Sequence, residues 1–97
     1  MLEKDIERKM SLAFARRGAW AVKMEGTVAG LPDRLVVLPG GRCVWVELKQ
    51  DNGRLRPCQE QVIHKLRDMG HDVRIVYGLE QAMALVDEVM PNEIPSE

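Results

Sequence analysis

The sequence is poor in cysteine, in aromatic residues and in long apolar runs. Its 97 residues include two cysteines, Cys43 and Cys58, which are too few for a disulfide framework, so a reduced intracellular protein is expected. Aromatic residues make up only 4% of the chain, and no apolar run approaches the length of a membrane span. The residues from Met1 to Asp5 do not resemble a signal peptide. We therefore expect a cytoplasmic protein that does not associate with membranes.

An excess of charge of one sign is also missing. Fourteen Lys and Arg residues stand against 15 Asp and Glu residues, a formal net charge of −1, so bulk basicity does not indicate a nucleic-acid partner. A local basic patch remains compatible with a neutral total. The composition, 45% hydrophobic and 30% charged, is typical of a globular chain. The length predicts one domain, residues 1–97, with residues 91–97 a frayed polar tail.

Hydrophobic periodicity and turn residues predict seven elements in the order α-β-β-β-α-β-α. Helices are expected at residues 2–17, 57–69 and 79–90, and strands at 19–24, 34–38, 42–49 and 72–77. Pro39-Gly40-Gly41 is a strong hairpin signal, so the first three strands should form an antiparallel meander. The expected class is α/β, with a mixed sheet flanked by helices.

One predicted strand carries charge inside an apolar run. Glu47 and Lys49 alternate with Val46 and Leu48, so the acid and the lysine share one face of the strand. Ionised groups resist leaving water unless they are paired or bind something. Asp33 begins a neighbouring strand, and two carboxylates on adjacent strands repel unless a cation lies between them. Such a pair beside a lysine suits a divalent metal ion and a phosphodiester.

Structural explanations compete with this one. Asp33 follows a Gly-Leu-Pro turn and could be a turn former, while Glu47 and Lys49 could be an ion pair on an edge strand. Glu3 and Glu7 flank the apolar stripe of the first helix and could reach the rim of a site. The favoured explanation from spacing alone is a solvated acidic first turn, which stabilises the helix dipole.

The order of motifs resembles a known nuclease family. Pro32-Asp33 followed by Glu47-Leu48-Lys49 is the PD-(D/E)xK signature of metal-dependent nucleases. The wider sequence resembles a stand-alone phage or bacterial VRR-NUC (virus-type replication-repair nuclease) domain from the first helix through Tyr77. The segments that carry the resemblance are residues 30–41, 46–49, 53–59 and 66–70. It implies a restriction-endonuclease-like PD-(D/E)xK core, which agrees with the predicted order of elements.

The resemblance implies a metal site on these strands. Asp33 and Glu47 would bind Mg²⁺ or Mn²⁺, with the backbone carbonyl of Leu48 assisting. Lys49 would orient or activate the attacking water and steady the charge that develops on phosphorus.

The resemblance also implies supporting residues on two helices. Gln59, which helical spacing directs toward the sheet, would support the site. The first-helix acid would be Glu7, by its distance from Gly18 and by similarity to archaeal-type junction resolvases. Glu3, one helical turn earlier, is the competing candidate.

The implied activity is a divalent-metal-dependent, structure-specific DNA endonuclease of a bacterial or phage-infected cell. It would hydrolyse phosphodiester bonds in branched DNA such as four-way (Holliday) junctions. No aromatic or bidentate constellation for reading bases is visible, which disfavours sequence-specific cutting. Alternatives are a non-catalytic DNA-binding or assembly module, and a nuclease that acts on flaps or single strands. Four basic residues would contact the DNA backbone, namely Lys23, Arg34, Arg54 and Arg56.

A symmetric homodimer is expected, because junction resolution needs two cuts related by a two-fold axis. The expected contact surfaces are an exposed Trp20 or Trp45, or the apolar residues of the last helix. Those helical residues are Leu79, Met83, Leu85, Val86 and Met90.

Overall fold

The computed structural model describes residues 1–24, 26 and 28–91, so residues 92–97 of the predicted tail lie outside the described part. The elements in chain order are α1 (Glu3–Arg16), β1 (Trp20–Lys23), β2 (Arg34–Val37), the 3₁₀ turn η1 (Pro39–Gly41), β3 (Cys43–Lys49), α2 (Pro57–Asp68), β4 (Val73–Tyr77) and α3 (Gly78–Val89). The predicted order of helices and strands is confirmed, and each boundary agrees to within one residue.

The four strands form one mixed sheet in the order β1-β2-β3-β4. β1 pairs with β2 and β2 with β3 in antiparallel fashion, as predicted for the meander. Gly40 and Gly41 both take a φ of 81° in the turn between β2 and β3, a conformation that favours glycine. β4 returns parallel to β3, and α2 provides the long crossover that a parallel pair requires.

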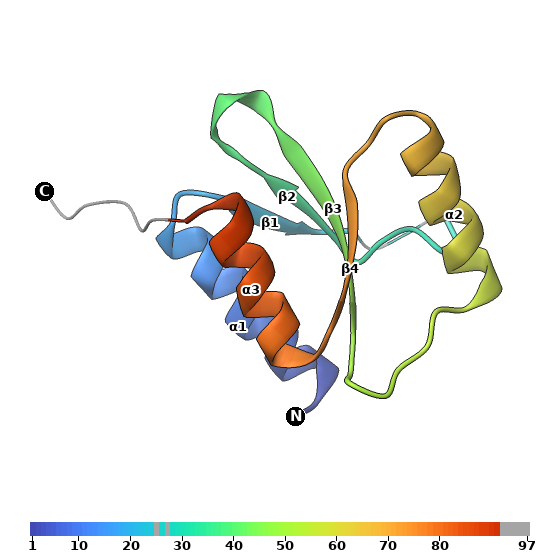
Figure 1. Cartoon of the computed structure of the whole chain (residues 1–97), viewed down its shortest axis with the longest axis horizontal. Coiled ribbons are helices and arrows are strands. Elements are labelled where there is room, and N and C mark those ends of the chain that lie inside the picture. Colours follow the sequence, from blue (N-terminus) through green and yellow to red (C-terminus); the bar gives the residue numbers. More distant parts are fainter. Residues whose placement is uncertain (25, 27, 92–97) are drawn as a thin grey trace, which may run out of the picture.

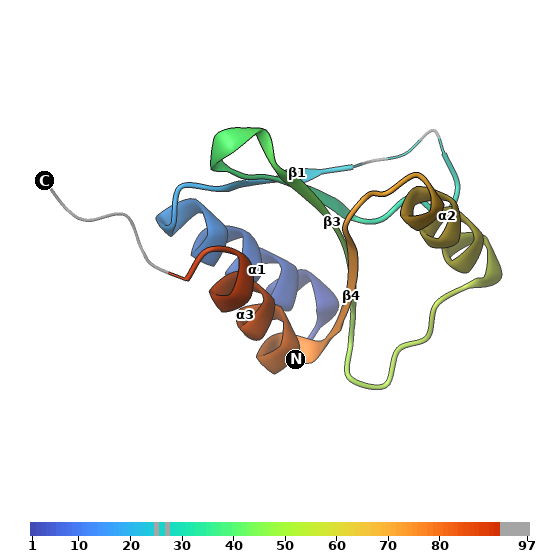
Figure 2. The same ribbon diagram turned by 45° about the horizontal axis from the view of Figure 1, so that its top comes forward.

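The helices lie on both faces of the sheet. α1 and α3 lie side by side on one face, and α2 lies on the other (Figures 1 and 2). The main core lies between the sheet and the α1–α3 layer, because alternate strand residues point into it. Its most fully buried members are Ile6, Met10, Phe14, Val36, Val44, Val46, Leu48, Ala82 and Val86.

The side chains of α2 divide between the sheet and solvent. Ile63 and Gln59 are buried, whereas Met69 is 60% exposed, although helical spacing predicts one apolar face formed by Val62, Ile63, Leu66 and Met69. That part of the prediction is wrong because α2 ends at Asp68, and Met69 belongs to the cap that follows. No helix among the described residues is long and apolar enough to cross a membrane.

The surfaces expected to join two chains differ in exposure. Leu85 and Val86 of α3 are buried in the main core, so that helix does not present the open apolar face that the sequence suggested. Trp20, by contrast, is 69% exposed, and its register partner Val37 is 38% exposed. Trp45 is half-buried. Trp20 and Val37 therefore form an exposed apolar pair on the sheet, whereas the exposed Leu12 lies on α1.

Candidate active site

Asp33 is positioned by the turn that precedes it. Gly30 has a φ of 88°, and a Cβ at this residue would lie 2.3 Å from the carbonyl oxygen of Cys58 at the start of α2. Only glycine allows this approach, so the turn packs directly on α2. Asp33 then accepts a hydrogen bond through Oδ2 from the backbone N–H of Leu48, at 3.1 Å. This contact fixes the carboxylate against β3.

Glu47 lies on β3 with its side chain 1% exposed. Its Oε2 atom lies 3.2 Å from Nζ of Lys49 and accepts a hydrogen bond of 3.2 Å from Nε2 of Gln59. Its Oε1 atom is also buried, and no residue of the described part donates a hydrogen bond to it. One oxygen of this carboxylate is therefore held by Lys49 and Gln59, and the other is buried beside Asp33 without a hydrogen-bond donor in the described part.

The electrostatics of Glu47 reflect this burial. Loss of solvent raises the pKa of Glu47 to about 7, and the nearby charge of Asp33 acts in the same direction. Lys49 opposes both effects through its charge and its contact with Oε2. The two carboxylates therefore resist being ionised together unless additional positive charge is present.

Gln59 connects α2 to this site. The side chain is 4% exposed and lies in the first turn of α2, as expected for a residue directed toward the sheet. Its Oε1 accepts a hydrogen bond of 2.9 Å from the backbone N–H of Arg56, while its Nε2 donates to Glu47. Both ends of the amide are used, so the donor that faces Glu47 is fixed.

The two acids of α1 have different surroundings. Glu7 forms an ion pair with Arg34, whose side chain is 15% exposed. Burial raises the pKa of Glu3, and the charge of Asp33 raises it further while Lys49 lowers it. Glu3 is therefore within electrostatic reach of Asp33 and Lys49, whereas Glu7 is engaged by Arg34.

The basic residues also separate into two groups. Arg34 pairs with Glu7 and donates a hydrogen bond of 3.2 Å to the carbonyl of Ala21, so its guanidinium is engaged within the protein, and its contact with DNA stays a prediction. No sequence pattern indicates this structural role, because Glu7 and Arg34 meet only through the packing of α1 on β2. Lys23, Arg54 and Arg56 are exposed and remain accessible to a phosphate backbone.

The donor set fits a hard divalent cation completed by substrate. Asp33 and Glu47 offer carboxylate oxygens, and Oε1 of Glu47 has no hydrogen-bond donor in the described part. Within residues 1–24, 26 and 28–91, no group of three or more His, Cys, Asp or Glu side chains gathers as a metal cage. Mg²⁺ is commonly held by one or two carboxylates together with water and substrate phosphates, so two acids suffice.

Comparison with known proteins gives two independent similarities. The model of the VRR-NUC domain family matches residues 4–80. A solved structure described as a VRR_NUC domain is 28% identical, covers 88% of this chain and 94% of its own, and superposes with a TM-score of 0.81. No curated protein matches the sequence.

A second solved structure shares the fold at lower identity. It is Hjc of Archaeoglobus fulgidus, a Holliday junction resolvase from an archaeal hyperthermophile, with 18% identity and a TM-score of 0.57. The match covers 77% of this chain and 67% of that one. The two chains thus share the mixed sheet flanked by helices. Because the family model spans most of the sequence, this chain belongs to the VRR-NUC domain family.

Proposed function

We propose that this chain is a divalent-metal-dependent endodeoxyribonuclease that hydrolyses phosphodiester bonds in branched DNA. The observation that carries the proposal is the buried Oε1 atom of Glu47, which lacks a hydrogen-bond donor in the described part of the chain. It lies in a carboxylate fixed by Lys49 and Gln59, beside Asp33. Leaving such an atom unpaired is costly, so a site that binds a cation explains it better than a structural ion pair.

Each residue of the site has a role in this proposal. Asp33 and Glu47 would hold Mg²⁺ or Mn²⁺, with the carbonyl of Leu48 assisting. When bound, the ion would withdraw charge from the scissile phosphate and make an attacking water more acidic. Lys49, whose ammonium lies 3.2 Å from Glu47, would orient that water and offset the charge that develops on phosphorus. Gln59 would keep Glu47 in one orientation.

An acid from α1 would complete the site. The family resemblance selects Glu7, whereas the influence of Asp33 and Lys49 on the pKa of Glu3 favours Glu3. The ion pair with Arg34 holds Glu7 in place and leaves only part of its carboxylate for a ligand. Substitution of each acid separates the two possibilities, as set out in the Discussion.

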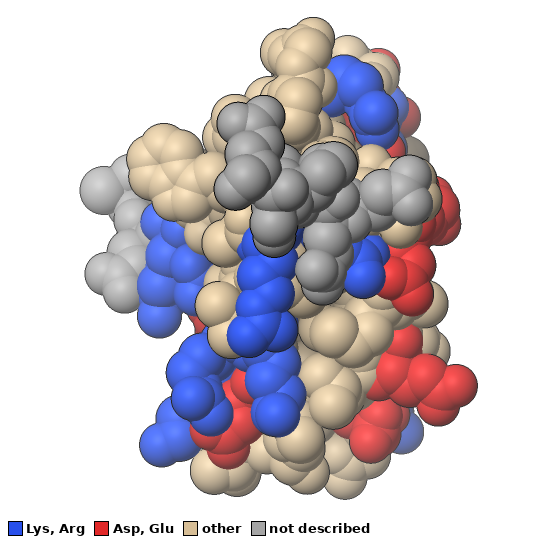
Figure 3. Space-filling view, turned by 90° about the vertical axis from the view of Figure 1, so that its left-hand side faces the viewer, with Lys and Arg blue, Asp and Glu red and all other residues tan. Residues whose placement is uncertain are grey.

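Charge separation on the surface supports a DNA substrate. Although the formal net charge is −1, Lys and Arg side chains gather along the left and centre of the face in Figure 3, with a few Asp and Glu among them, and the right edge carries mostly Asp and Glu. A basic surface of this kind attracts the phosphate backbone without selecting a sequence. Lys23, Arg54 and Arg56 would contribute phosphate contacts nearer the site.

A four-way junction is the proposed preferred substrate, and a homodimer the proposed active form. The support is the fold shared with a Holliday junction resolvase and the need for two symmetric cuts. Trp20 and Val37 supply an exposed apolar pair on the sheet through which two copies could associate.

The test is a cleavage panel of four-way junction, flap, splayed and blunt duplex DNA of equal length, each with Mg²⁺ and with Mn²⁺. Paired nicks in the junction are expected to dominate. Preferred cutting of flaps or single strands would replace the junction with that substrate. Binding of DNA with no cleavage under any condition would show a non-catalytic DNA-binding module and overturn the enzymatic proposal.

A further inference from the structure

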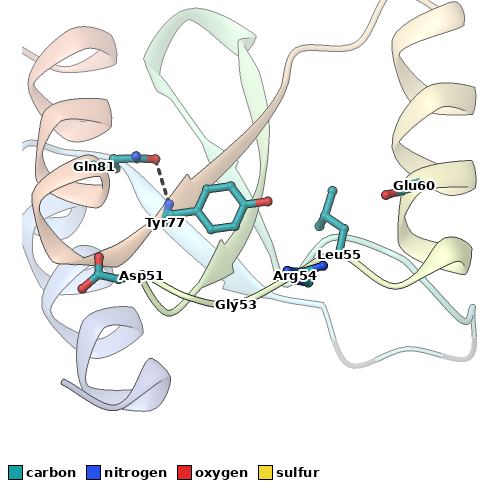
Figure 4. Close-up of a pocket in the computed structure, with 7 residues that line it drawn as sticks. All are labelled: Asp51, Gly53, Arg54, Leu55, Glu60, Tyr77 and Gln81. Carbon is teal, nitrogen blue, oxygen red and sulfur yellow. Dashed lines mark hydrogen bonds between the residues drawn. The ribbon is translucent and has the colours of Figure 1, made fainter.

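A cleft opens where the parallel strands β3 and β4 end. Its lining does not include Asp33, Glu47, Lys49 or Gln59. It is an open, shallow cleft with a volume of about 660 Å³. Figure 4 shows the Tyr77 ring extending from the end of β4 across this cleft toward Arg54 and Leu55. The cleft is lined by Asp51, Gly53, Arg54, Leu55, Glu60, Tyr77 and Gln81.

The cleft adjoins the proposed site through Lys49. Lys49 and Tyr77 are register partners in the parallel pair of strands, so their side chains emerge on the same face of the sheet. Gly53 packs against Lys49 so closely that a Cβ at Gly53 would lie 3.1 Å from the Cβ of Lys49. A DNA strand whose phosphate lies at Glu47 and Lys49 would therefore pass beside the cleft.

The walls of the cleft are held in place by specific contacts. The backbone N–H of Tyr77 donates a hydrogen bond of 2.9 Å to Oε1 of Gln81, which fixes the end of β4 on the first turns of α3. Gly78 has a φ of 81°, and a Cβ there would lie 1.8 Å from Oδ1 of Asp51. The Asp51 carboxylate thus packs on the N-terminus of α3, where a negative charge is stabilised. The cleft is formed before any ligand binds.

The charges of the lining indicate which part of a nucleotide could enter. Two carboxylates, those of Asp51 and Glu60, disfavour a phosphate inside the cleft but not a neutral base. A carboxylate can also accept a hydrogen bond from an exocyclic amino group of a base. Arg54 is exposed and has no ion-pair partner among the described residues, so it can bind a phosphate at the edge of the cleft.

We infer that this cleft binds an unpaired nucleotide next to the scissile phosphate, with its base stacked on Tyr77 and its phosphate beside Arg54. This inference rests on the proposed nuclease function. Stacking on an aromatic ring is tolerant of sequence, because every base has a planar face. The faces of a base within a duplex are covered by its neighbours, so only an unpaired or extruded nucleotide can reach Tyr77. The cleft selects DNA with unpaired nucleotides near the cut over continuous duplex.

The test compares binding of splayed DNA and blunt duplex of equal length by fluorescence anisotropy in EDTA, which prevents metal-dependent cleavage. Tyr77→Leu removes the ring and keeps an apolar side chain, whereas Tyr77→Phe keeps the ring and removes the hydroxyl. Tyr77→Leu is expected to weaken binding of splayed DNA about 5- to 100-fold and leave duplex binding unchanged. Tyr77→Phe is expected to bind both DNAs like the wild type.

Each other outcome overturns the inference. Equal loss on splayed DNA and duplex after Tyr77→Leu would indicate a general backbone contact or a folding defect. Equal loss in Tyr77→Leu and Tyr77→Phe would assign the effect to the hydroxyl. If Tyr77→Leu bound splayed DNA as tightly as the wild type, the inferred base subsite would be refuted, and the nuclease proposal would stand. Absence of DNA binding and cleavage by the wild type would instead overturn both proposals.

Discussion

Gln59 of α2 and Glu47 of β3 are joined by a buried hydrogen bond, in which Nε2 of Gln59 donates to Oε2 of Glu47 over 3.2 Å. The same amide accepts a hydrogen bond from the backbone N–H of Arg56, so its orientation is fixed. The contact holds the start of α2 against the centre of the sheet. It also leaves Oε1 of Glu47 as the oxygen without a hydrogen-bond donor in the described residues.

Loss of this contact should impair both stability and cleavage. Gln59→Ala removes the donor to a buried carboxylate and the acceptor for Arg56, which should cost about 1–3 kcal/mol of unfolding free energy. Cleavage should fall roughly 10- to 100-fold, as is typical when a residue that supports a metal ligand is removed. Urea unfolding and initial cleavage rates measure the two effects. Gln61→Ala, an exposed position on the same helix, is the matched control and should change neither. Wild-type cleavage by Gln59→Ala would refute the supporting role.

The raised pKa of Glu47 predicts a pH-dependent stability of the metal-free protein. The pKa rises from 4.5 to about 7 on folding, so the neutral carboxyl is favoured in the folded state. Its contribution to stability is fully present below about pH 4.5 and is lost as the pH rises through about 7. Glu47→Gln stays neutral, so it should exceed the wild type in stability at pH 8 by on the order of 3 kcal/mol. At pH 4 the two proteins should differ little.

Urea unfolding in EDTA at pH 4, 6 and 8 measures this difference. Added Mg²⁺ at pH 8 should stabilise the wild type and not Glu47→Gln, because a ligand that binds only the folded state raises its stability. A Glu47→Gln protein that is less stable than the wild type at pH 8 would contradict the proposed cost of ionising Glu47.

The two acids of α1 should respond differently to loss of charge. Glu7→Gln breaks the ion pair with Arg34. Both side chains of this pair are largely shielded from water, so the substitution should lower the unfolding free energy by about 1–3 kcal/mol. Glu3 forms no ion pair in the described part of the chain, so Glu3→Gln should retain stability while lowering cleavage and Mg²⁺ affinity. If Glu7→Gln folds normally but is inactive and Glu3→Gln is fully active, Glu7 is the first-helix acid.

The exposed pair on the sheet predicts where two chains associate. Light scattering at micromolar concentration should give twice the chain mass for the wild type and the chain mass for Trp20→Lys. A lysine is costly to bury in an apolar contact, whereas Trp20 already lies 69% exposed in the single chain, so the fold should be unaffected. Leu12→Lys, at an exposed apolar position on α1, is the control and should remain dimeric. A monomeric wild type would contradict the dimer.

Much of this architecture could be predicted from the sequence, because local patterns determine it. Alternation placed Glu47 and Lys49 on one face of β3, helical spacing directed Gln59 toward the sheet, and glycine-rich turns marked the meander. The role of Arg34 could not be predicted, because its contact with Glu7 depends on how α1 packs over β2. Tyr77 was missed for a similar reason. Its position beside Lys49 follows from the register of β4 on β3, which sequence periodicity does not specify.

The proposal that Asp33 and Glu47 support metal-dependent cleavage is tested most directly by initial cleavage rates on one labelled four-way junction. The wild type, Asp33→Asn, Glu47→Gln and the exposed-acid control Glu80→Gln are compared with Mg²⁺ and with EDTA. Cleavage by the wild type and the control is expected only with Mg²⁺. Both ligand variants should lose more than the roughly 10- to 100-fold expected for Gln59→Ala, while remaining folded. Mg²⁺-dependent cleavage at the wild-type rate by Glu47→Gln, or wild-type cleavage that persists in EDTA, would contradict the account.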